Sequence, residues 1–228
     1  MWNRQQVKEQ AKIIMKRNYW KMFVVTLLAG LLTGEKTTII ERVQNFASTN
    51  ISYDTSPIFY SSNFQYIFYT FISIASILGI LYTIFIGNVI VVGKSRYFIK
   101  NHDVNPELGE IFSGFKGNYL NVVKIMFLMN LKILLWLFLF IVPGIIKAYE
   151  YSMIPYLLAE NPNLSASQAF SLSKQMTTGQ KMDLFVLDLS FLGWIILGLI
   201  CCGIGILFLQ PYPEATRAEV YLILKQQV

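Results

Sequence analysis

Charged side chains inside long apolar stretches are the residues of this sequence most able to do chemistry. A lysine or aspartate at the centre of a membrane-spanning helix opposes insertion by about 2.5 to 3.5 kcal/mol, so it is retained where it pairs or lines a polar path. Two interpretations stay open: pairs that hold helices together, or a transport path. The intramembrane candidates are Lys124, Lys132, Lys147, Glu150, Asp188, Glu214 and Arg217.

The spacing of these charges predicts pairs. If the cytoplasmic ends of the helices align, Asp188 lies closer in depth to Lys124 than to Lys132, so we predict a Lys124–Asp188 pair. Lys147 and Glu150 are three residues apart and can pair on one helix face. Lys132 is then left for a cavity or for another partner.

The C-terminal charges allow two interpretations. Glu214 and Arg217 have the same three-residue spacing, beside Pro211 and Pro213, which lack backbone donors. A proline-broken helix that carries charges can line a watery cavity, but it can equally be a helix that leaves the membrane.

Catalytic signatures are absent from this sequence. It has no Gly-rich phosphate loop, no HExxH motif and no histidine paired with a plausible serine or cysteine nucleophile. The single histidine, His102, is interpreted as a solvated connector residue, and the adjacent Cys201 and Cys202 as small apolar residues. We therefore predict that the protein is not an enzyme and holds no metal or cofactor.

The composition excludes a water-soluble globular domain. Hydrophobic residues make up 54% and charged residues 14% of the chain, whereas a soluble domain carries about 25% charged residues. The mean hydropathy is +0.48. The bilayer is therefore the better solvent for this chain.

The net charge of +6 indicates membrane orientation rather than nucleic-acid binding. Of 19 basic residues, six precede the first apolar run: Arg4, Lys8, Lys12, Lys16, Arg17 and Lys21. This placement is the positive-inside signal for a cytoplasmic N-terminus. Apolar residues recur between them at helical spacing, so residues 1–19 are predicted to form a basic amphipathic helix at an anionic leaflet surface. That helix can be a topology anchor or a lipid sensor.

Hydropathy predicts an all-α, polytopic transmembrane helix bundle with a single integral membrane domain over residues 1–228. The clearest span, 64–93, has thirty residues without a charge. Pro143-Gly144 is predicted to reverse the chain after the third span. Six spans are expected, at about 20–40, 64–93, 119–142, 144–160, 182–201 and 203–224. Hydropathy alone favours the alternative of five spans, in which residues 184–209 form one helix.

Internal similarity favours six spans. Asn18-Tyr19 and Asn118-Tyr119 open two of them, and Gly79, Gly144 and Gly205 each begin a return helix. The predicted pattern is three hairpins, each preceded by an interfacial amphipathic helix. Both termini then lie in the cytoplasm.

Three blocks carry a resemblance to a known family: Asn18-Tyr19-Trp20-Lys21, residues 143–149 with Pro155-Tyr156, and residues 187–194. Over nearly the whole chain the sequence resembles an uncharacterised polytopic membrane-protein family of Gram-positive bacteria, catalogued only as a domain of unknown function. That family is distantly similar to the membrane part of some glycerophosphodiester phosphodiesterases, but this sequence contains no such catalytic domain. The resemblance implies a six-helix plasma-membrane protein and supplies no substrate.

We expect a non-enzymatic, multi-pass bacterial plasma-membrane protein that binds lipid or a small partner. Such a role suits envelope homeostasis or protection against membrane-active peptides. The alternative is a transporter or channel component with a polar intramembrane path. Expected partners are membrane lipids and the anionic leaflet surface, with a protein partner or a second copy left open.

Overall fold

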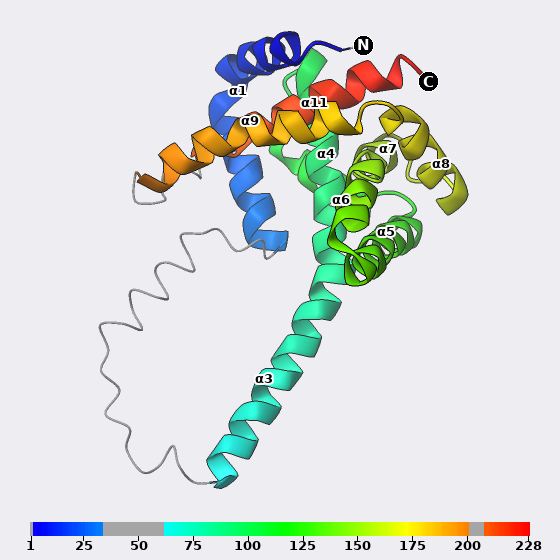
Figure 1. Ribbon diagram of the computed structural model, residues 1–228. Helices are drawn as coiled ribbons and strands as arrows, with labels where there is room; N and C mark the ends of the chain where they lie inside the picture. Colours follow the sequence, from blue (N-terminus) through cyan, green and yellow to red (C-terminus); the bar gives the residue numbers. More distant parts are fainter. Residues whose placement is uncertain (1, 34–61, 201–207) are drawn as a thin grey trace.

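The computed structural model describes residues 2–33, 62–200 and 208–228. Within these ranges the chain is helical and contains no strand, which confirms the predicted all-α class. The elements shown in Figure 1 are α1 (Arg4–Thr33), α3 (Ser62–Tyr82), the π-helix η2 (Thr83–Gly87), α4 (Asn88–Asp103), the 3-10 helix η3 (Leu108–Phe115), α5 (Tyr119–Leu139), α6 (Ile141–Glu150), α7 (Ile154–Glu160), α8 (Ala166–Thr177), α9 (Lys181–Ile200) and α11 (Pro211–Lys225).

Two described helices are long and apolar enough to cross a membrane, Tyr66–Asp103 and Tyr119–Leu139. They favour a membrane protein. The six predicted spans and their three hairpins are not confirmed. Parts of the predicted spans 20–40, 182–201 and 203–224 lie outside the described residues, as do Cys201 and Cys202.

A kink at Asn18 divides α1 where the sequence predicts the surface helix to meet the first span. Asn18 has non-helical angles of φ −132° and ψ 28°. Its buried Nδ2 donates to Oδ1 of Asn101 on α4, at 2.7 Å. This hydrogen bond gives the buried Nδ2 of Asn18 an acceptor and fixes the two halves of α1 against α4.

The elements α3, η2 and α4 form one continuous helical path, and its two ends differ in environment. The side chains described in α3, from Tyr66 onwards, are exposed on every face, whereas most of α4 is buried. Figure 1 shows α3 extending away from the helices gathered around α4. A helix that is apolar all round and uncovered by protein is suited to lipid.

The reversal after α5 occurs earlier than predicted. Phe140 is extended, with φ −155° and ψ 139°, and Pro143 lies in the first turn of α6, where its missing N–H leaves no helical bond unmade. A Cβ on Gly144 would overlap Leu137, so glycine lets α6 fold back closely against α5.

Residues 144–160 do not form the single span that we predict. A turn at residues 151–153 separates α6, of ten residues, from α7, of seven. A ten-residue helix rises only about 15 Å, half the hydrocarbon thickness. The break lets Glu150 and Tyr156 reach different neighbours.

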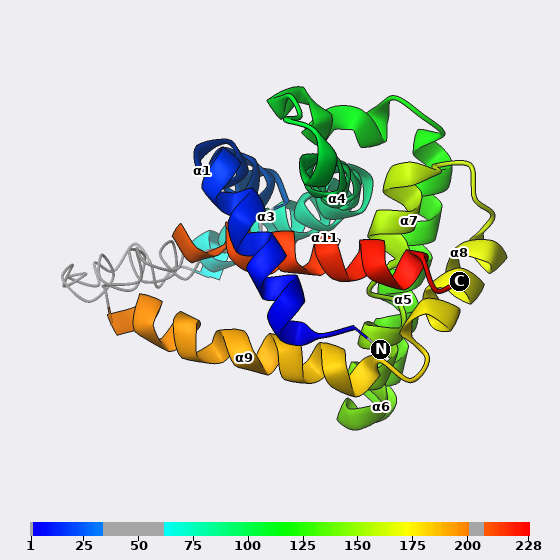
Figure 2. The ribbon, with the colours of Figure 1, turned by 90° about the horizontal axis from the view of Figure 1, so that it is seen from above.

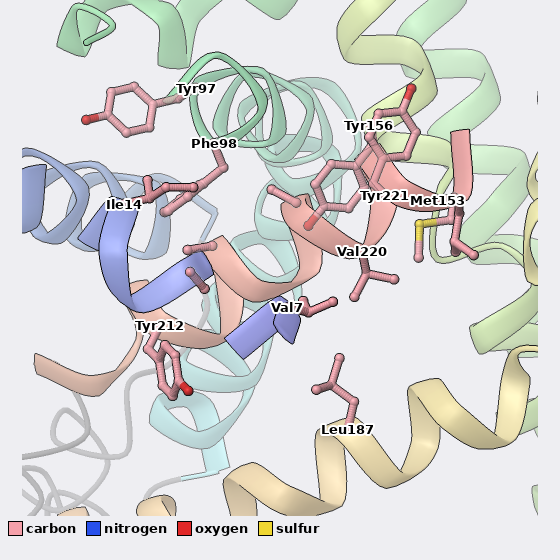
Figure 3. Close-up of a cluster of buried hydrophobic side chains, with 14 of the residues drawn as sticks. Val7, Ile14, Tyr97, Phe98, Met153, Tyr156, Leu187, Tyr212, Val220 and Tyr221 are labelled. Carbon is pink, nitrogen blue, oxygen red and sulfur yellow. The ribbon is translucent and has the colours of Figure 1, made fainter. Parts of the chain in front are cut away.

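The helix α11 lies in the middle of the fold rather than leaving it. Buried residues along α11 pack in one core with side chains of α1, α4, α7 and α9. In Figure 3, Val7, Leu187 and Val220 gather in this core, and Tyr156 lies beside Tyr221. The two tyrosine rings stack with centroids 5.2 Å apart.

The direction of the last helices differs from the hairpins expected from sequence. Figures 1 and 2 show α9 and α11 running across the direction of α3 and α4, whereas transmembrane hairpins would run along it. Charged residues on α11 find their partners on α4 and α9 in this crossed arrangement. The helix α8 begins with a capping box, in which Ser165 and Gln168 each accept a hydrogen bond from the other's backbone N–H.

Gly93→Ala is expected to destabilise the protein by about 1 to 3 kcal/mol, because the new Cβ would overlap the carbonyl oxygen of Ile111 where α4 crosses η3. Gly79→Ala, in α3 on the same helical path, is the matched control. No atom lies within 4 Å of its Cβ position, so alanine should be neutral or stabilise by about 0.5 to 1 kcal/mol. Thermal unfolding in detergent measures both. Equal effects would contradict the close crossing.

Candidate ligand-binding cavity

A cavity of about 510 Å³ lies between α4, α5, α6, α7, α9 and α11. Four charged side chains line it: Lys94, Asp188, Glu214 and Arg217. Polar hydroxyl groups come from Ser95, Tyr149, Ser152 and Tyr156, and the apolar wall includes Met129, Ile133, Leu137, Ile145, Leu184 and Leu187. The lining is therefore amphipathic.

An ion pair connects α4 to α11 at this cavity. Lys94 Nζ lies 2.7 Å from Glu214 Oε1, with side chains 9% and 27% exposed. Lys94 follows the clearest predicted span directly and is absent from the residues selected from sequence. The sequence feature that could have identified Lys94 is its position directly after an apolar run.

Asp188 of α9 has two partners, neither of which is Lys124. Its Oδ2 accepts from Arg217 Nη2 at 2.9 Å and from the hydroxyl of Tyr149 at 3.0 Å. The predicted Lys124–Asp188 pair is therefore wrong, because α9 crosses the fold instead of running beside α5 with aligned ends. Lys124 is exposed on α5.

Arg217 keeps donors available to a ligand. A guanidinium has five N–H donors. One of them binds Asp188, and the side chain remains 50% exposed where it borders the cavity. Arg217 is the charged group of the cavity best able to accept a new hydrogen-bond partner.

The other selected charges lie away from the cavity. Lys147 binds Glu150 at 2.8 Å, the pair that their spacing predicts. Lys181 binds the same buried carboxylate at 2.6 Å and was not foreseen, since it comes from α9. Lys132 is exposed, with Nζ 3.7 Å from the centroid of the Phe170 ring.

The structure thus brings three of the selected residues together, Asp188, Glu214 and Arg217, and separates the rest from them. Glu214 and Arg217 do not pair with each other; each takes a partner from another helix. Sequence alone identifies three of the charged residues that line the cavity, but each of them pairs with a residue far away in the sequence. Sequence spacing cannot show that pairing.

His102 has a structural partner, which corrects its interpretation as a solvated connector residue. Its Nδ1 lies 2.8 Å from Oε1 of Glu219, whose side chain is buried. His102 is 40% exposed and fastens the end of α4 to α11. Among the described residues, no group of three His, Cys, Asp or Glu side chains is placed to hold a metal ion.

The basic residues of α1 divide between internal contacts and the surface. Lys8 donates to Ser190 of α9 at 2.5 Å, Arg17 to the carbonyl of Asn101, and Lys21 to Asn105. Burial, with the neighbouring charges Lys12 and Arg4, lowers the pKa of Lys8. The remaining predicted surface contacts, Arg4, Lys12 and Lys16, are exposed.

Comparison with known proteins relates the C-terminal part of the chain to a family of unknown function. Residues 138–228 match a family model described as a protein of unknown function (DUF975). The matched part runs from the end of α5 through α11, so it contains Tyr149, Asp188, Glu214 and Arg217. No curated protein and no solved structure matches the chain. The family likeness is thus found over this C-terminal part and supplies no activity.

Lys94→Met is expected to destabilise the protein by roughly 3 kcal/mol, the low end for breaking a buried pair, because Glu214 loses its ammonium partner. The double variant Lys94→Met/Glu214→Gln should recover part of this loss, with a coupling of about 0.5 to 3 kcal/mol. Thermal unfolding of the single and double variants measures the coupling. Strictly additive effects would contradict a direct pair.

Proposed function

We propose that the protein is a non-enzymatic, integral protein of the bacterial plasma membrane that binds a lipid or another small amphipathic molecule in this cavity. The observation that carries the proposal is the division of the lining into paired charges and an apolar wall. Ligand pockets commonly enclose about 300 to 1,000 Å³ and combine an apolar lining with a few placed polar groups. The cavity has this size and character.

The balance of charge suits a polar head group. Two cations and two carboxylates line the cavity, so a ligand need not bring net charge. Arg217 can donate to acceptor oxygens of a head group, while Met129, Ile133 and Leu184 offer contact to a hydrocarbon chain. An amphipathic molecule satisfies both parts of the lining.

The membrane setting of the proposal is supported by the apolar helices. The uncovered helix α3 and the exposed basic residues of α1 fit a chain anchored in a bilayer with a cytoplasmic N-terminus. A role in envelope homeostasis or in protection against membrane-active peptides is compatible with lipid binding. We extend the proposal to a cytoplasmic C-terminus, on the same side of the membrane as the N-terminus.

Filling the cavity tests ligand binding. Ala148→Trp places an indole in the lining and should remove lipid that co-purifies with the wild type, as measured by native mass spectrometry. Ile146→Trp is the control, since Ile146 lies two residues earlier in α6, is 45% exposed and is not part of the lining. Matching melting temperatures would show that both variants fold. A wild type without lipid, or equal retention in both variants, would rule out the proposal.

A transporter or channel component is the second candidate. It is favoured by the meeting of Asp188, Glu214 and Arg217 in one cavity, because charges of both signs can line a polar path. Flux into proteoliposomes that stops in Arg217→Gln would support it over binding alone.

A reporter fused after Val228 should give a cytoplasmic signal, because an even number of spans returns the C-terminus to the side of the N-terminus. Fusion after Asp103, in the predicted connector 94–118, should also report the cytoplasm and serves as an internal reference. An external signal after Val228 with a cytoplasmic signal after Asp103 would show an odd number of spans and contradict the cytoplasmic C-terminus.

A further inference from the structure

We propose a second lipid site on the surface of α5 and α6, which binds the phosphate of an anionic phospholipid. Its residues are Lys132 and Trp136 of α5, Lys147 of α6, Tyr151, and Phe170 of α8; we call them the lysine–aromatic patch. Only Tyr151 also borders the cavity. The inference rests on membrane location and does not depend on a ligand in the cavity.

The patch consists of two ammonium groups joined by aromatic rings. Lys132 Nζ lies 3.7 Å from the centroid of Phe170, and Phe170 meets Tyr151 edge to face at 4.9 Å. Lys147 Nζ lies 5.7 Å from the centroids of both Tyr151 and Trp136. Lys132 and Trp136 are four residues apart, so they share one face of α5.

The patch carries an excess of positive charge. Glu150 is the carboxylate beside it, and that group is shared between Lys147 and Lys181. Within the described part of the chain, no carboxylate lies at ion-pair distance from Lys132. Its cation contacts the Phe170 ring, and this contact leaves the charge of the ammonium unneutralised. A bound anion would neutralise this excess positive charge.

The surroundings favour a lipid phosphate over a soluble one. Trp136 is 39% exposed, and α5 also exposes Leu134, Leu135 and Phe138. Lys132 lies seven residues before the end of α5, so its long, flexible side chain can extend towards the membrane interface, where basic and aromatic side chains meet head groups. A phospholipid can place its phosphate at Lys132 and its acyl chain along this apolar surface.

The test titrates the purified protein in detergent with phosphatidylglycerol or phosphatidylcholine and counts bound lipid by native mass spectrometry. The wild type should prefer phosphatidylglycerol, and Lys132→Gln should weaken its binding about fivefold, the effect of about one lysine–headgroup contact. Lys132→Arg should keep the preference. Lys124→Gln, the control on the same helix, removes an exposed lysine outside the patch and should leave the preference unchanged.

Two further arms separate the alternatives. Inorganic phosphate in excess should not displace the lipid; displacement would assign the patch to a soluble phosphate and overturn the lipid proposal. Ala148→Trp should remove cavity lipid and keep the preference for phosphatidylglycerol, so the two sites are read independently. Equal losses in Lys132→Gln and Lys124→Gln, or no preference in the wild type, would overturn the patch.

Discussion

Buried charge on the C-terminal helix is the constraint on which the rest of the fold depends. On α11, Glu219 is buried and Glu214 is partly buried, and an unpaired carboxylate inside a protein costs several kcal/mol. Both find cationic or imidazole partners on α4, Lys94 and His102. α11 must therefore lie against α4 in one register, and Arg217 then faces Asp188 of α9.

The cavity follows from this pairing. The helices α9 and α11 cross α4. Their ion-paired side chains therefore line one cavity together with apolar side chains of α5 and the hydroxyl of Tyr149. The break between α6 and α7 contributes as well, since it turns Tyr156 towards Tyr221 while Glu150 stays with its lysines. Charges that hold the helices together also form the polar part of the cavity.

The two proposed sites differ in charge, and this difference gives each a distinct preference. The cavity is balanced, since its cations are paired with carboxylates, and suits a polar head group without net charge. The lysine–aromatic patch has an excess of positive charge around Lys132 and suits an anionic phosphate. The apolar exterior of α3 and α5 connects both sites to a lipid environment.

Local sequence determined what depends on neighbours along the chain. Helical periodicity and apolar length predicted the all-α class and the apolar run 64–93, and three-residue spacing predicted the Lys147–Glu150 pair. Tertiary structure decided what depends on how helices cross. Asp188 pairs with Arg217 rather than Lys124. A hydropathy profile gives the approximate depth of a residue in the membrane, but not the direction in which two helices cross. That direction depends on which charged side chains pair inside the fold.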